Sequence, residues 1–235
     1  MQPESITFRS GGLTASVRSD HVKLLISCSV SSRSVTDLCR QALLSPLGLP
    51  EPARCVVPGD SVAIVLDPET PNVIELLGAV CEQLQVVPEA GGTLSLLLPP
   101  DPDNTGWSRL VEQIPAHLQQ QLTVHMHDPA ETAQLSYLAS SAAGDRVYLN
   151  RRICDADLLV TIGMVCFDSL LGYRGTTSGI FPAFSDADAI QQARTQGHPE
   201  LTPEQPRPYR QLIDEVGWLL GTQFSVQIVP GPDDS

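Results

Sequence analysis

Three short apolar runs place the strongest constraint on how this chain can fold. They are Ser61–Leu66 (SVAIVL), Thr93–Leu98 (TLSLLL) and Asp157–Gly163 (DLLVTIG). A continuous apolar run of this length is typical of a strand that is buried on both faces, since a half-exposed strand would alternate with polar residues. We therefore expect a parallel sheet covered on both sides.

Segments with helical periodicity separate these runs. The sequence predicts helices at Ser34–Leu44, where Ser34 can act as the N-cap, and at Asn72–Leu84, Trp107–Gln120 and Arg210–Leu220. It predicts further strands at Leu122–His127, Arg146–Leu149 and Gln223–Val229. Strands that alternate with helices form right-handed βαβ units, so we expect an α/β fold with a mainly parallel, Rossmann-like doubly wound sheet.

The two ends of the chain differ from this core. Residues Ile6–Arg18 alternate between apolar and polar around two glycines, which predicts a small β-hairpin within residues 1–20. We expect the α/β core to span 34–229, and the whole of 1–235 to form a single domain. Gly197–Pro208 is rich in proline and is expected to be an exposed connector.

Charge and composition exclude several classes of partner. The hydrophobic content of 42% is enough for a packed core, whereas the formal net charge of -13 disfavours nucleic acid and anionic membrane surfaces. No apolar run approaches the roughly 18 residues that a membrane span requires, and the first residues do not resemble a secretion signal. The six cysteines form no C-x-x-C pair, which indicates reduced thiols and a cytoplasmic location.

Strand polarity predicts where a ligand would bind. In an open parallel sheet, ligands lie beyond the carboxyl ends of the strands. Here those ends are the loops at Asp67–Pro71, Pro99–Asp101 and Met164–Ser178. We expect these three loops to converge on one pocket.

Several strings occur in an order that points to one known family. They are Pro58–Val65, Asp67–Pro71, Val147–Gly163 and Gly172–Pro182. In order and spacing they resemble the N-terminal domain of the nickel-pincer lactate racemase family, and the resemblance extends through Tyr209–Val229. No single string is specific, but their collinear order over most of the chain is.

The resemblance implies a cofactor and a reaction. Members of the family use a pyridinium mononucleotide that holds nickel in a pincer and is joined to a lysine. They racemise or epimerise 2-hydroxy acids by hydride transfer to this cofactor, while histidines move the hydroxyl proton. A C-terminal domain closes over the site, and we expect it to be absent from this chain, so that a separate chain would have to supply that half.

Five residues match family positions that contact the cofactor: Asp67, Thr70, Gly172, Tyr173 and Gly175. The first two lie in a loop that departs from the family's D-x-x-T-R-P pattern, because the arginine before Pro71 is missing. An Asp-Pro-Glu-Thr-Pro loop can also be a plain β-turn. The glycine-rich turn is expected to keep free backbone N–H groups that could cradle an anion.

The positions that carry the family's chemistry are occupied by other residues. Asp168 stands where the signature has a histidine, and Ser178 stands where it has the cofactor-linked lysine. The family's second histidine follows the strand at Thr93–Leu98, where this chain has Pro99–Pro102 instead. We therefore predict no catalytic residue at these positions.

Three histidines are candidate metal ligands. His198 lies near the family's nickel-binding histidine, although a solvated histidine in a connector is the alternative. His125 and His127 share one strand face, which can suit a metal, but no third ligand is visible. Cys166 follows a buried strand, which indicates an inert thiol.

Two hypotheses follow. The first is a racemase or epimerase of 2-hydroxy acids, or half of one that another chain completes. The second, which we favour, is a catalytically degenerate relative that keeps the fold and uses the old cleft to bind a small anionic ligand, a 2-hydroxy acid, a nucleotide or a partner. It is favoured because the lysine, both histidines and the loop arginine are absent together.

Overall fold

The computed structural model describes residues 5–10, 13–18, 33–101, 106–195, 197 and 205–229. The chain divides into two compact units. One comprises Met1–Arg33 with Pro230–Ser235, and the other comprises Ser34–Val229. A single domain over 1–235 stays a prediction.

The first unit contains the predicted hairpin. Strands β1 (Ser5–Ser10) and β2 (Leu13–Arg18) pair antiparallel, from Ser5 opposite Arg18 to Ser10 opposite Leu13. The alternating pattern of this segment therefore predicted its structure correctly.

The second unit is built on a five-stranded parallel sheet in the order β11-β8-β3-β4-β5. The strands are β3 (Ser61–Leu66), β4 (Thr93–Leu98), β5 (Leu122–Met126), β8 (Leu158–Met164) and β11 (Phe224–Ile228). The three apolar runs and the segments predicted at Leu122–His127 and Gln223–Val229 all form strands of this sheet, and the α/β fold class is confirmed. The strand order reverses between β3 and β8, which is the crevice where doubly wound sheets bind ligands.

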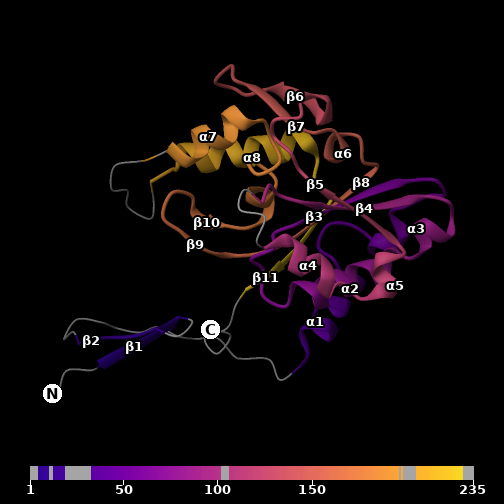
Figure 1. Ribbon diagram of the computed structural model, residues 1–235, viewed down its shortest axis with the longest axis horizontal. Coiled ribbons are helices and arrows are strands. Elements are labelled where there is room, and N and C mark those ends of the chain that lie inside the picture. The colour runs from indigo at the N-terminus through magenta and orange to yellow at the C-terminus, as the bar shows by residue number, and fades with distance from the viewer. Residues whose placement is uncertain are drawn as a thin grey trace. The chain divides into compact units, whose positions relative to one another are not determined.

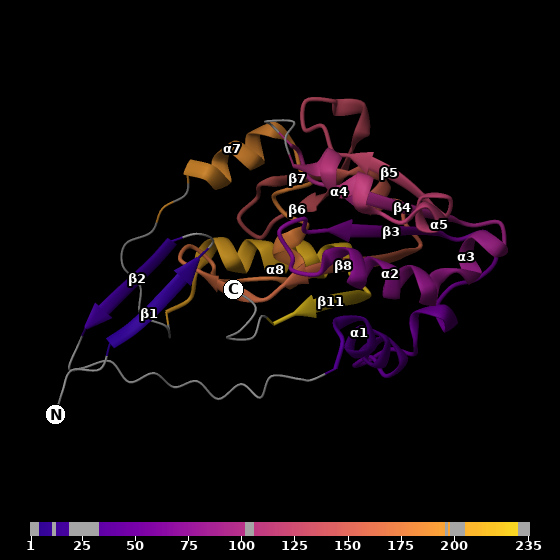
Figure 2. The same ribbon diagram turned by 60° about the horizontal axis from the view of Figure 1, so that its bottom comes forward.

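One face of the sheet is covered by the first group of helices (Figure 1). These are α1 (Val35–Leu44), α2 (Val73–Leu84), α3 (Val86–Glu89), α4 (Trp107–Gln113) and α5 (Ala116–Gln119), with a 3₁₀ turn η1 (Pro52–Arg54). The buried side chains of alternate sheet residues, such as Ile64 and Leu96, pack against the apolar stripe of α2. Figure 2 shows β11 at the sheet edge next to α1.

The opposite face carries the elements from the second half of the chain, which cover it with a separate apolar cluster. They are the hairpin β6 (Leu135–Ser140) and β7 (Arg146–Asn150), the helices α6 (Arg151–Cys154), α7 (Ala187–Thr195) and α8 (Pro208–Leu220), the small hairpin β9 (Cys166–Asp168) and β10 (Gly172–Arg174), and the turns η2 (Thr132–Gln134) and η3 (Thr176–Gly179). Phe184 and Ile213 are fully buried in this cluster.

Local signals explain where several helices start and stop. The hydroxyl of Ser34 accepts a hydrogen bond from the backbone N–H of Asp37, as an N-cap does. Helix α8 begins with Pro208 and ends at Gly221, which adopts a left-handed conformation. The single helix expected at Trp107–Gln120 is wrong, because Pro115 interrupts it and separates α4 from α5.

The sequence missed some elements. Strand β6, which pairs with β7 outside the main sheet, was not predicted. The strands β9 and β10 and the helix α7 were not predicted either. In the portion of the chain that is described, no helix combines the length and apolarity that crossing a membrane would require.

Candidate functional site

A small cavity lies at the carboxyl ends of β3, β8 and β11. Its volume is about 200 Å³, and it sits where the strand order reverses. Asp67 enters it from the end of β3, Gly163 from β8 and Gln227 from β11. The turns after β8 close the rest of the cavity with Asp168, Leu171, Arg174, Gly175, Thr176, Ser178 and Gly179. Asp67 and Gly175 therefore meet in one place, as strand polarity predicted.

An arginine that the sequence did not single out joins the two main loops. The Arg174 guanidinium donates to Asp67 Oδ2 at 2.6 Å and to Glu69 Oε2 at 2.8 Å. Partial burial lowers the pKa of Arg174, but hydrogen bonds and charges from Glu69 and Asp67 outweigh this and leave the pKa raised. The loop that lacks the family's arginine thus receives a guanidinium from β10 instead.

The glycine-rich turn depends on positive φ values, which residues other than glycine rarely adopt. Gly172 and Gly175 have φ values of +83° and +123°. A Cβ at Gly175 would also lie 3.0 Å from Gln227 Oε1 and from the carbonyl oxygen of Met164. Thr176 has a φ of +55° although it is β-branched.

The N–H groups of this turn are not free, so the prediction of an open anion cradle is wrong. The Gly175 N–H donates to Ser178 Oγ at 2.7 Å, and the Thr176 N–H donates to Gln227 Oε1 at 3.0 Å. Side-chain oxygens of the protein already occupy the positions that an anion's oxygens would take. No local pattern could predict this, because Gln227 belongs to a strand and lies 51 residues from Thr176 in the sequence.

A buried arginine stabilises the glycine-rich turn through hydrogen bonds. Arg210 on α8 is 7% exposed and donates to the carbonyl oxygens of Tyr173 and Gly175 and to Thr176 Oγ1. Its guanidinium lies 3.9 Å from the centre of the Tyr173 ring and pairs with Asp214. Tyr173 itself does not line the cavity, so its direct contribution is to hold Arg210.

The residues at the family's catalytic positions act as turn caps. Ser178 Oγ accepts the Gly175 N–H and donates to the Gly175 carbonyl oxygen. Asp168 Oδ1 accepts the backbone N–H groups of Leu170 and Leu171 at 2.9 and 2.8 Å. Both line the cavity, yet their oxygens already have backbone partners there.

Two predicted residues lie elsewhere. Thr70 is 3% exposed, and its hydroxyl has no partner among the residues described, but it does not line the cavity. The expectation that Pro99–Asp101 joins the same pocket is wrong. Asp101 accepts the N–H groups of Gly106 and Trp107 and so caps α4, while Pro100 and Asp101 border a different cavity beside α7. His198 lies outside the described residues.

Of the two histidines, His127 is part of the core, whereas His125 is only half-buried. His127 is 2% exposed; its Nε2 lies 2.7 Å from the Ser185 carbonyl oxygen and its Nδ1 lies 3.0 Å from Asn150 Nδ2. The resolved ranges contain no cluster of three or more His, Cys, Asp or Glu that could hold a metal ion. Partial burial raises the pKa of the Cys166 thiol, as expected of an unreactive cysteine.

Residues 107–200 match the family model of the lactate racemase N-terminal domain. The resemblance to the lactate racemase family is confirmed. The match includes β8, the turn at Gly172–Gly175 and the two positions Asp168 and Ser178.

Solved structures support the fold over a longer stretch. The lactate racemase apoprotein from Thermoanaerobacterium thermosaccharolyticum matches with a TM-score of 0.73 and 14% identity, covering 96% of this chain and 56% of that one. A structural-genomics protein from Thermotoga maritima matches with a TM-score of 0.59 and 13% identity, covering 84% of this chain and 52% of that one.

This chain therefore spans about half the length of the solved proteins that it matches. At these identities the likeness shows the fold alone. Comparison with curated protein sequences gave no match.

Proposed function

We propose that this chain is a lactate racemase-like N-terminal domain that binds a small 2-hydroxy acid at the carboxyl edge of its sheet without catalysing racemisation. The observation that carries the proposal is Arg174. It is the arginine that lines the cavity, and one of its two partners, Glu69, has a side chain that is 65% exposed.

The charges of the cavity indicate how such a ligand would bind. Arg174 is held by two carboxylates, of which Asp67 is 15% exposed and is the better fixed. A ligand carboxylate can replace the exposed Glu69 on the guanidinium, because planar N–H pairs suit any carboxylate. The hydroxyl of the ligand would then donate to Asp67 or Asp168.

Size favours a small acid over a nucleotide. A volume of about 200 Å³ is below the 300–1,000 Å³ that is typical of sites for drug-sized molecules and cofactors. The backbone N–H groups that would bind a phosphate are already used by Ser178 and Gln227. We therefore retain the 2-hydroxy acid and drop nucleotide binding.

The lining does not fit a lysine-linked nickel-pincer nucleotide. The sequence contains one lysine, Lys23, which precedes the whole α/β unit. At the family's lysine position, the Ser178 hydroxyl is bonded to the backbone of Gly175. A serine has neither the charge nor the nucleophilicity of an amine, and among the residues that the structure describes no histidine lines the cavity to move a proton.

If Glu69 competes with the ligand for Arg174, substitutions at these two residues should change the affinity for the ligand in opposite directions. L-Lactate binding is measured by calorimetry for the wild type, Glu69→Gln and Arg174→Gln, with glycerol as a neutral ligand. Removing the competing carboxylate in Glu69→Gln should tighten L-lactate binding several-fold. Arg174→Gln should weaken it at least tenfold, since charged hydrogen bonds contribute about 1.5–3 kcal/mol.

Arg40→Gln is the matched control. Arg40, on α1, also pairs with an exposed glutamate, Glu82, but it does not line the cavity. This substitution should leave binding unchanged. Equal affinities in Glu69→Gln and Arg174→Gln, or binding of glycerol as tight as that of L-lactate, would refute the proposed role of Arg174.

A further inference from the structure

A second hollow lies at the opposite end of the sheet from the cavity described above. It has a volume of about 330 Å³ and is bordered by the first residues of β3 and β4, by η2 and by α6. In Figure 1, α6 lies toward the right, whereas the β9–β10 hairpin of the first cavity lies toward the left. The two cavities share no lining residue.

The register of β3 and β4 creates this hollow. Ser61 is paired with Thr93 and Ala63 with Ser95, so four small side chains lie side by side on one face. The residues between them, Val62 and Leu94, are bulky and buried on the other face. A parallel sheet is ordinarily covered on both faces, and here small side chains leave one of them open to a ligand.

The wall of the hollow is basic. Arg151 and Arg152 both line it, and Asp155 is the acidic residue among the lining side chains. Arg151 donates only a long bond of 3.4 Å to the Leu135 carbonyl oxygen. The Arg152 guanidinium takes part in none of the ion pairs found in the described portion of the chain.

The backbone that carries the two arginines is held by hydrogen bonds to a buried side chain. Asn150 is 3% exposed; its side-chain oxygen accepts the Arg152 backbone N–H and its amide nitrogen contacts the buried His127. The nearby Asp157 is already engaged, since its Oδ2 accepts both the N–H and the hydroxyl of Ser61. The Arg152 charge also helps burial to lower the pKa of His125 on the edge strand β5.

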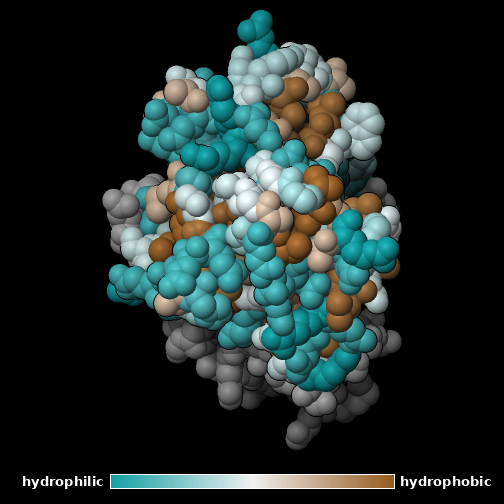
Figure 3. All heavy atoms as spheres, turned by 90° about the vertical axis from the view of Figure 1, so that its right-hand side faces the viewer, coloured by the Kyte–Doolittle hydropathy of each residue, from teal (hydrophilic) through white to brown (hydrophobic). Residues whose placement is uncertain are grey.

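From this placement we propose a second binding site, in which Arg151 and Arg152 hold the phosphate or carboxylate group of a small anionic molecule above Ser61 and Ser95. The average charge of the chain repels anions, so a paired basic wall over a polar floor is a local exception. Much of the face turned to the viewer in Figure 3, the right-hand side of Figure 1, is hydrophilic, with hydrophobic residues in small separate groups, which suits a polar ligand.

The test is a nuclear magnetic resonance titration of the isotope-labelled chain with inorganic phosphate and, separately, with succinate, a dicarboxylate that has no 2-hydroxyl group. Saturable chemical-shift changes are expected at the backbone amides of Ser61 and Ser95 and at the ring of His125. The pKa of His125 should rise when the anion is bound. The double variant R151Q/R152Q should lose at least tenfold in affinity.

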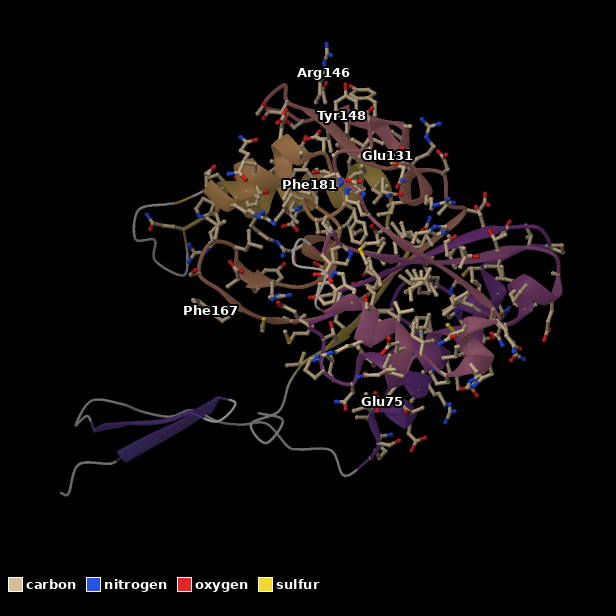
Figure 4. The ribbon with its side chains drawn as sticks, in the orientation of Figure 1. Glu75, Glu131, Arg146, Tyr148, Phe167 and Phe181 are labelled. Carbon is tan, nitrogen blue, oxygen red and sulfur yellow. The ribbon has the colours of Figure 1, made fainter. Side chains whose placement is uncertain are left out.

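Two controls separate this site from its alternatives. Arg146→Gln removes an arginine that projects outward from β7 in Figure 4, and it should leave the titration unchanged. Arg174→Gln should also leave it unchanged, which distinguishes this site from the 2-hydroxy acid cavity. Shifts that do not saturate, that persist in R151Q/R152Q, or that move to the β9–β10 hairpin would overturn the proposal.

Discussion

Thr176 keeps a backbone conformation that its own side chain disfavours. Its φ of +55° is adopted readily by glycine but costs a β-branched residue about 1–2 kcal/mol. Three contacts offset this cost: Oγ1 donates to the Gly175 carbonyl oxygen, Arg210 donates to Oγ1, and Gln227 accepts the Thr176 N–H. Thr176 thus keeps a backbone conformation that is typical of glycine, because neighbouring side chains hold it.

His127 shows the same dependence on neighbours in the core. Burial lowers its pKa below the ordinary value of 6.5, although the hydrogen bond to Ser185 and the charge of Asp128 partly oppose the shift. The unfolded chain takes up a proton at this residue near pH 6.5, whereas the folded chain does so only at lower pH. Protonation therefore favours unfolding.

Acid should consequently destabilise the protein in a window that begins near pH 6.5. The free energy of unfolding, measured by urea denaturation, should fall between pH 7.5 and 5.5, by up to about 1.4 kcal/mol per pH unit for each histidine. His125, whose pKa burial and Arg152 also lower, adds to the effect with the same sign. The double variant H125Q/H127Q should lose most of this pH dependence; an unchanged slope would show that other groups cause it.

At the scale of elements, the packing of α8 against η3 holds the site together. Gly217 on α8 faces the side chain of Thr177, and a Cβ at this position would overlap it. The same helix carries Arg210, which binds the turn at Gly175. Figure 4 shows how the flanking aromatic residues differ: Phe181 lies inside the unit, whereas Phe167 points outward from β9.

Two glycine-to-alanine variants should therefore have opposite effects. Gly217→Ala should lower the free energy of unfolding by roughly 1–3 kcal/mol through overpacking. Gly78→Ala on α2 should raise it by up to about 1 kcal/mol, because its Cβ would meet only Leu118 Cδ1 at 3.9 Å and alanine favours a helix. Denaturant titrations measure both, and a stabilised Gly217→Ala would contradict this packing.

The elements that the sequence predicted correctly are those with a strong local signal. The buried runs of β3, β4 and β8 and the apolar stripes of α1, α2 and α8 depend on residues close in sequence. β6 was missed because it is half-exposed and pairs outside the main sheet, and α7 because none of its residues is buried. Both are held by contacts that a local pattern does not encode.

At the scale of the whole molecule, strand polarity predicted the place of the site but not its contents. Asp67 and Gly175 meet at the carboxyl edge, as the alternation of strands and helices implied. The partners that decide its chemistry, Arg174 with Asp67 and Gln227 with Thr176, join segments 107 and 51 residues apart. Such contacts depend on the packing of the whole fold and carry no motif of their own.

We propose that this fold binds without reacting. By the resemblance to lactate racemases, Ser178 and Asp168 stand at the positions of the groups that would tether a cofactor and move a proton, and their oxygens are hydrogen-bonded to the backbone of their own turns. Positioning a reacting centre can lower a barrier by about 7–11 kcal/mol, and a positioned acid or base adds a further ~10²–10⁴-fold in rate. Losing both should leave no measurable turnover.

The most direct measurement is to incubate the purified chain with nickel, the pincer cofactor and L-lactate, and to follow D-lactate by chiral chromatography together with the intact mass. Lys23→Arg is the matched control, because it removes the only amine side chain that could carry a lysine-linked cofactor. We expect D-lactate at the level of the buffer blank and no cofactor-sized mass increase in either protein. D-Lactate formation above the blank, or an adduct mapping to Thr177–Ile180, would contradict this account.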